Sequence, residues 1–217
     1  MSMQNTPGFE TYAFVQRMAA NVALVHTWPG EAAALAHRAL DEGGTRTSLV
    51  GEDQPGGGAV MYFAEDDFGD DRLGELADEL TLRGIGAYAY SLVHDDLADA
   101  HVDAFARVGR AHPREGRKVV LVHTFIHDVP EGIGATTWVF GASGDLAEAA
   151  LALSPRFEVA PVREPEGLTA LEVSHLELNA GLSRPVEAQR SLTQALQEAG
   201  FEGPVLMTNN ATPPPTA

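Results

Sequence analysis

An internal repeat constrains the fold of this 217-residue chain more than any other feature of its sequence. The tripeptide Pro29-Gly30-Glu31 matches Ser143-Gly144-Asp145, and Gly86 matches Gly200. Both pairs are 114 residues apart. Self-similarity on this scale indicates a duplicated supersecondary unit, so we expect two copies of one arrangement.

Hydrophobic periodicity predicts the same order of elements in both halves of the chain. Apolar residues at every second position favour strands, and apolar residues at a period of 3.6 favour helices. In the first half, the pattern predicts strands at Phe9–Met18, Asn21–Thr27, Thr45–Gly51, Ala59–Glu65 and Ala87–His94, and helices at Gly30–Leu40 and Asp70–Arg83. In the second half, it predicts strands at Lys118–His127, Thr136–Gly141, Phe157–Arg163, Leu168–Leu178 and Val205–Thr208, and helices at Pro185–Ala199 and Ser143–Leu153, the last with Ser143 as its N-cap.

Each half is therefore a leading strand followed by β-α-β-β-α-β, which is the ferredoxin-like order. We predict an α+β protein of two tandem ferredoxin-like units, residues 9–95 and 117–208, each with an extra leading antiparallel strand. Residues 96–116 are predicted to join the units as a helix. The proline-rich tail, residues 209–217, is predicted to be disordered.

The stretch VVLVHTFIHD, Val119 to Asp128, carries two histidines four residues apart. It looks like VALVHTWP at Val22 to Pro29, but the repeat places it opposite FETYAFVQRM, the leading strand of the first half. His123 and His127 then correspond to Phe14 and Met18. On a strand, residues four apart lie ~13 Å from each other at ~3.3 Å per residue, too far to share one metal ion. We predict no metal site.

The alternation of side chains along the same strand also indicates where a ligand of this protein would bind. Val120, Val122, Thr124 and Ile126 should face the helices, which leaves His123 in the middle of a half-buried second face. That face is the first place to look for a pocket. The candidate ligand-binding residues are His123, His127, His26 and His175.

The sequence shows no recognisable motif for catalysis or for cofactor binding. The acidic run EDDFGDD, Glu65 to Asp71, lacks the order of an EF-hand loop. The junction FGASGD, Phe140 to Asp145, has neither a Walker A lysine nor a GxSxG elbow. No Ser-His-Asp spacing is recognisable. We therefore expect no catalytic residues and no cofactor.

The charge of the chain limits its partners. It has 31 acidic and 14 basic residues, a formal net charge of −17. Such a surface repels phosphate backbones, which excludes direct nucleic-acid binding, and it attracts basic proteins. We expect a protein partner to be recognised by Glu65, Asp66, Asp67, Asp70, Asp71 and Glu75. An acidity that reflects genome composition alone is the competing interpretation.

Composition also predicts where the protein is found. No apolar run approaches the roughly 20 residues that span a bilayer, and MSMQNTPGFE does not look like a secretory signal. The chain has no cysteine, which fits a cytoplasmic location. We expect a cytoplasmic protein without membrane contact. Self-association into a homo-oligomer is left open.

The second half resembles the B-type family of bacterial regulators of ribonuclease E activity. The residues that carry the resemblance are TTWVFGASGDLAEAALAL from Thr136, FEVAPV from Phe157 and LEVSHLELN from Leu171, followed by a helix and a strand. The aromatic, glycine-containing ending of that family is replaced here by GPVLMTNN. The resemblance implies a protein-binding regulator without catalytic residues.

Three functional hypotheses follow. The first is a non-enzymatic regulatory or adaptor protein that binds another protein through its acidic surface. The alternative is an enzyme or a protein that binds a small ligand, such as haem or a metal, in a histidine-lined pocket on a sheet face or between the units. A structural or self-assembling protein is the third reading.

Overall fold

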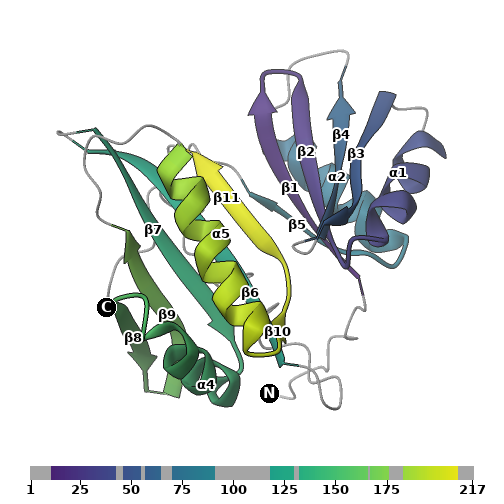
Figure 1. Ribbon diagram of the computed structural model, residues 1–217. Helices are drawn as coiled ribbons and strands as arrows, with labels where there is room; N and C mark the ends of the chain where they lie inside the picture. The colour runs from purple at the N-terminus through teal and green to yellow at the C-terminus, as the bar shows by residue number, and fades with distance from the viewer. Residues whose placement is uncertain are drawn as a thin grey trace. The chain divides into compact units, whose positions relative to one another are not determined.

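The computed structural model describes residues 11–42, 46–54, 57–64, 70–90, 118–129, 132–165, 167–175 and 183–209. It divides into two compact units, Met1–Tyr90 and Ser91–Ala217. Within the described residues each unit has one sheet and two helices, which confirms the α+β class (Figure 1). The predicted linking helix lies outside the described residues, as does the predicted tail beyond residue 209.

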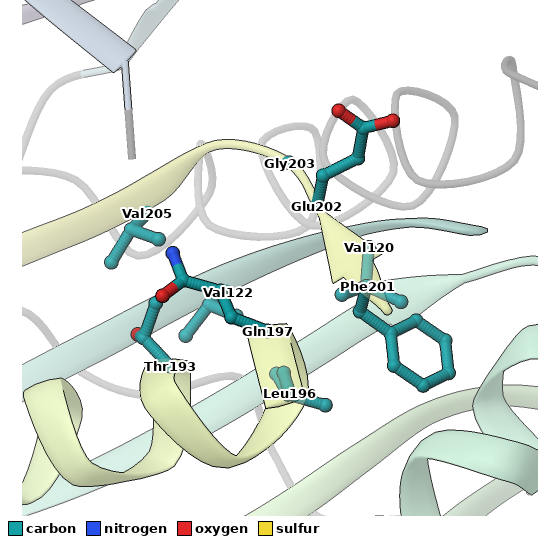
Figure 2. A pocket seen from close by; sticks show the side chains of 9 residues that line it. All are labelled: Val120, Val122, Thr193, Leu196, Gln197, Phe201, Glu202, Gly203 and Val205. Atoms are coloured by element: carbon teal, nitrogen blue, oxygen red, sulfur yellow. The ribbon is translucent and has the colours of Figure 1, made fainter. Parts of the chain in front are cut away.

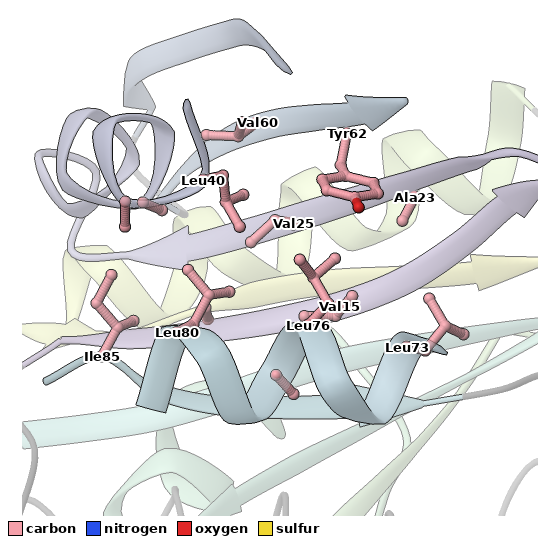
Figure 3. Close-up of a cluster of buried hydrophobic side chains, with 14 of the residues drawn as sticks. Val15, Ala23, Val25, Leu40, Val60, Tyr62, Leu73, Leu76, Leu80 and Ile85 are labelled. Carbon is pink, nitrogen blue, oxygen red and sulfur yellow. The ribbon is translucent and has the colours of Figure 1, made fainter. Parts of the chain in front are cut away.

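The first unit has a five-stranded sheet in the order β3-β4-β2-β1-β5. Its strands are β1 (Tyr12–Ala19), β2 (Val22–Trp28), β3 (Arg46–Gln54), β4 (Gly57–Phe63) and β5 (Gly86–Tyr90), and its helices are α1 (Ala32–Glu42) and α2 (Asp70–Leu82). Strand β1 is antiparallel to β2 and parallel to β5. Both helices pack on one sheet face, where Leu40 of α1 and Leu76 of α2 meet Val15 and Val25 (Figure 3). The helix α1 buries mainly alanines, so it lies close to the strands.

The second unit repeats this arrangement. Its strands are β6 (Lys118–Val129), β7 (Gly132–Gly141), β8 (Val159–Glu164), β9 (Gly167–His175), β10 (Phe201–Glu202) and β11 (Val205–Asn209), and its helices are α4 (Ser143–Leu153) and α5 (Ser183–Glu198). The sheet order is β10-β6-β7-β9-β8, and β11 also pairs with β6. The helices cover the face that carries Val120, Val122 and Val139, as predicted for the alternation along β6.

The leading strand lies inside the sheet in both units. Strands β1 and β6 each pair antiparallel with the strand that follows them. Each also pairs in parallel with the last strand of its unit. The leading strand thus separates β2 from β5 in the first unit and β7 from β11 in the second. The sequence did not predict this placement.

The structure corrects the repeat at single residues. Gly84 and Gly200 follow the second helix of their units with φ values of 85° and 83°, so they are the equivalent glycines, 116 residues apart. The predicted match of Gly86 with Gly200 is wrong, because Gly86 begins β5 and donates its N–H to the carbonyl oxygen of Thr11. In the first helix, Ala33, Ala36 and Leu40 correspond to Leu146, Ala149 and Leu153, an offset of 113 residues.

Two predicted element boundaries also change. Ser143 is the first residue of α4 and not its N-cap; the N-cap is Ala142, which makes no side-chain hydrogen bond. Strand β7 begins at Gly132, four residues before the predicted Thr136. Gly132 and Gly134 lower the strand propensity of this segment, but both pair with β6.

The short strand β10 was missed because Gly203-Pro204 interrupts the last strand. Phe201 pairs with Lys118 and Val205 with Val122, so the register beside β6 is the same before and after the interruption. The N–H of Val122 donates to the carbonyl oxygen of Pro204 at 2.9 Å. Gly203 has a φ of 143°, and a Cβ atom there would overlap the carbonyl oxygen of Val120. Only glycine fits this position without a shift of the backbone.

We predict that Gly203→Ala lowers the free energy of unfolding by about 3 kcal/mol, because the methyl group meets backbone atoms in a conformation that alanine disfavours. The control is Gly144→Ala in the exposed first turn of α4, where nothing lies within 4 Å of the new Cβ atom. That change should leave stability unchanged or raise it by up to about 1 kcal/mol. Urea unfolding of both variants measures the difference. Equal stabilities would contradict the close approach of Gly203 to β6.

Candidate functional site

The candidate site is built on a row of side chains across the second sheet. His123 of β6 pairs with Leu206 of β11 on one side and with Trp138 of β7 on the other. Trp138 pairs with Glu172 of β9, and Glu172 pairs with Ala160 of β8. Paired residues point to the same face, with Cβ atoms about 4.5–5.5 Å apart. We call Leu206, His123, Trp138, Glu172 and Ala160 the cross-sheet row.

This row lies on the face opposite α4 and α5, because its neighbours along the strands pack against those helices. Val122, Val139 and Leu171 each precede or follow a row residue, and all three belong to the core beneath the helices. Aromatic rings flank the row. The His123 ring stacks on Phe125 with centroids 4.0 Å apart, and Trp138 lies 5.8 Å from Phe140.

His123 is 1% exposed, so it is more deeply buried than the half-buried position that the sequence predicted. Burial falls along the row toward the sheet edge. Trp138 is 3% exposed, Glu172 is partly exposed, and Ala160 on the edge strand β8 is exposed. The row therefore connects a buried aromatic region with the surface.

Two polar atoms of the row lack hydrogen-bond partners among the described residues. They are Nε1 of Trp138 and Oε2 of Glu172, and both are buried. Indole is only a donor and an ionised carboxylate is only an acceptor, so the two groups have complementary requirements. A buried polar atom without a partner costs about 1–3 kcal/mol and calls for an explanation.

The opposite face of the same strands holds a hydrogen-bond network that fixes the row. The hydroxyls of Thr124 and Thr137 lie 2.8 Å apart. Nε2 of Gln189, on α5, donates to Oγ1 of Thr124 at 2.9 Å and to the carbonyl oxygen of Leu206 at 2.6 Å. The network joins β6, β7, β11 and α5 beside His123 and Trp138. It thereby holds the backbone of the row in register.

The structure does not gather the other predicted histidines at this row. His127 lies on β6 opposite Gly134, and His175 lies at the end of β9 opposite Ala135; the side chains of both are outside the described residues. His26 belongs to the first unit, on β2 between Phe14 and Ala59. Its ring is partly exposed on the face that α1 and α2 leave uncovered.

The predicted acidic residues lie on or before α2. Asp70 and Asp71 are the first residues of this helix, and their side chains are not among the described parts of the chain. Glu65, Asp66 and Asp67 lie wholly outside the described residues. Glu75 is exposed and accepts a hydrogen bond from Arg72 at 2.7 Å. This bond raises the pKa of Arg72, and the Tyr62 hydroxyl adds to the effect.

A small cavity lies between α5 and the strands β6, β10 and β11 (Figure 2). Its walls are mainly apolar, and Oγ1 of Thr193 is the buried polar atom on them without a hydrogen-bond partner in the described part of the chain. The volume of about 10 Å³ is sufficient for roughly one water molecule. The cavity is too small to hold a larger ligand.

Trp138 and Glu172 were not among the residues that the sequence singled out. The alternation in LEVSH does place Glu172 on the face that avoids the helices. The sequence could not show that β9 lies beside β7, and this neighbour relation is what brings the carboxylate next to the indole.

Among the described residues, no three His, Asp or Glu side chains are close enough to hold a metal ion. No described helix is both long and apolar enough to cross a membrane. No family model, curated protein or solved structure matches the chain. The resemblance to the B-type regulators therefore stays a prediction.

We predict that His26 makes the stability of the protein depend on pH. Burial lowers the pKa of His26 from 6.5 to about 4. Between these values the unfolded chain binds a proton that the folded chain does not bind. The contribution of His26 to the free energy of unfolding is thus complete above pH 6.5 and is lost as pH falls toward 4.

The test is the urea midpoint of wild type and His26→Gln between pH 4 and 7. The variant should lose less stability than wild type on acidification, and His37→Gln on α1 is the matched control. Identical pH profiles for wild type and His26→Gln would show that His26 does not couple protonation to unfolding.

Proposed function

We propose that this chain is a non-enzymatic, cytoplasmic regulatory or adaptor protein that binds a basic protein partner. The observation that carries the proposal is the outer face of α2. Glu75, Asp78, Glu79 and Leu82 are spaced at i, i+3, i+4 and i+7, so they line one side of the helix. Leu82 is 89% exposed, and Glu75 and Asp78 are exposed beside it.

The charge of the chain supports a basic partner. The chain has 31 acidic and 14 basic residues. Even if every Lys and Arg formed one ion pair, 17 carboxylates would have no Lys or Arg partner. The ion pairs of the described residues include Arg72 with Glu75, Arg83 with Glu79 and Arg156 with Glu198. All three are on the surface. The remaining negative charge would steer a basic protein toward this chain.

The α2 face combines charge with an apolar contact. An exposed leucine surrounded by carboxylates fits a partner surface that offers an apolar pocket with lysines or arginines around it. The existing ion pairs do not prevent this contact. Exposed pairs contribute about 0–1 kcal/mol, so a partner's basic side chain can replace Arg72 or Arg83 at little cost.

We also propose that each unit is a ferredoxin-like β-α-β-β-α-β set into which the leading strand has been inserted. The order of helices and strands supports this assignment. The second unit is proposed to be related to the B-type regulators, and the order of elements from Thr136 onward and the acidity of the chain support it.

A second candidate function is the binding of a small ligand on the face of the second sheet that α4 and α5 do not cover. One observation favours it: the cross-sheet row places the buried His123 beside Trp138 and Glu172. Nε1 of Trp138 and Oε2 of Glu172 have no hydrogen-bond partner among the described residues.

We predict that the α2 face decides which proteins this chain captures. Wild type, immobilised and exposed to a host lysate at low salt, should retain basic proteins that Asp78→Lys/Glu79→Lys does not retain. The matched control Asp41→Lys/Glu187→Lys makes the same change of charge on exposed positions of α1 and α5. The control should retain the same proteins as wild type.

The affinity for a purified captured protein should fall between about 50 and 500 mM salt, because screening weakens exposed charge attraction. Leu82→Ala should weaken binding by a factor that depends little on salt, since it removes an apolar contact. Capture that is equal for wild type and the α2 variant would refute this surface as the binding site.

A further inference from the structure

We infer that Trp138 and Glu172 form the polar end of a binding site for a small uncharged molecule that carries a hydroxyl or primary amide group. The inference rests on the second candidate function and specifies it. The two residues are directly paired across β7 and β9, on the face that α4 and α5 do not cover. The sequence had pointed only to the histidines of this face.

The Trp138–Glu172 pair contains two polar atoms without partners among the described residues. Nε1 of Trp138 and Oε2 of Glu172 are buried, and neither has a hydrogen-bond partner among the described residues, including each other. The side chain of Trp138 is 97% buried, since only 3% is exposed. A donor and an acceptor held next to each other and left unpaired match a group that accepts from one and donates to the other.

The ligand group must both accept and donate a hydrogen bond. A cation would satisfy Glu172 but would leave the indole N–H without an acceptor. An anion would accept from the indole but would be repelled by Glu172 and by the net charge of −17. An apolar molecule would satisfy neither atom. A hydroxyl or a primary amide both accepts and donates, so it can bond to both residues.

Aromatic rings and the edge strand β8 border the Trp138–Glu172 pair. The rings of Phe140 and His123 lie beside Trp138, so the ligand should have an apolar or aromatic body next to its polar group. Access is on the side of the edge strand β8. There Glu172 is partly exposed, and its neighbour Ala160 is exposed and has only a methyl side chain.

The indole N–H of Trp138 is a direct reporter for a test. The chain has two tryptophans, so Trp28→Phe assigns the two indole signals in a nitrogen–proton correlation spectrum of the ¹⁵N-labelled full-length protein. The probes are phenol and benzamide, compared with toluene, which cannot form the bonds, and with benzamidinium, which can only donate. We expect phenol and benzamide to shift the Trp138 signal in a saturable manner, and toluene and benzamidinium to bind at least about tenfold more weakly.

Variants of the carboxylate locate the site. Glu172→Ala should weaken the binding of phenol and benzamide by about tenfold or more, because it removes a hydrogen bond to a charged group. Glu172→Gln keeps the size of the side chain and removes its charge. It replaces Glu172→Ala in the binding measurement if that variant does not fold. Glu187→Ala, on the exposed surface of α5, is the matched control and should bind both probes like wild type.

The outcomes separate this inference from the function on which it rests. If toluene or benzamidinium binds as well as phenol and benzamide, the sheet face binds ligands but the inferred ligand class is wrong. If none of the four probes shifts the Trp138 signal, both the inference and the ligand-binding function fail. A long-lived water molecule that stays at the indole N–H in the presence of the probes would also overturn the inference, since water would then be the partner of both atoms.

Discussion

The parallel pairing of the leading strand with the last strand is the constraint on which the rest of each unit depends. It joins β1 to β5 and β6 to β11, and it places the leading strand between two partners. Such a strand has no free edge, and its two faces are both available for packing. Phe14 and Val15 are 0% exposed, and Leu121 and Val122 are at most 2% exposed, although each pair points to opposite faces. The runs Tyr12–Val15 of β1 and Val119–Val122 of β6 are continuously apolar and buried, a pattern typical of strands that are covered on both sides.

The central position of β6 also explains how two kinds of chemistry share one strand. On the helix side, Thr124 joins Thr137 and Gln189 in a hydrogen-bond network. On the other side, His123 lies within the cross-sheet row. Because Gln189 also bonds to the carbonyl oxygen of Leu206, which pairs with His123, a change on the helix side would disturb the register of the row.

The sequence predicted the elements well and their neighbours poorly. Periodicity located both helices of each half and the alternation along β6, because a strand or helix is decided by residues close in sequence. It could not distinguish Gly84, which ends a helix, from Gly86, which begins a strand, since both are glycines in a loop-like context. Periodicity did not predict that Trp138 lies beside Glu172, because strand order is decided by long-range packing.

The sequence does contain one further sign of the repeat. Gln54-Pro55-Gly56-Gly57 is similar to Glu164-Pro165-Glu166-Gly167, and the first residue of each tetrapeptide pairs with its last.

The two units have the same strand order and differ in the side chains of one sheet face and of the second helix. Where the second unit has His123, Trp138 and Glu172 in one row, the corresponding strands of the first unit have Phe14, His26 and Ala59. Only the row of the second unit combines an indole donor with a carboxylate.

For the second helix of each unit, it is the first unit that carries the distinctive surface. At the offset of 116 residues, Gln194 occupies the position of Asp78 and Glu198 occupies the position of Leu82. The acidic face with an exposed leucine therefore belongs to the first unit and the polar row to the second. Backbone pairing and core packing constrain the strand order in both copies, whereas the surface of α2 and the sheet face opposite the helices are free to diverge. The protein-binding and ligand-binding proposals thus concern different units and can both hold in one molecule.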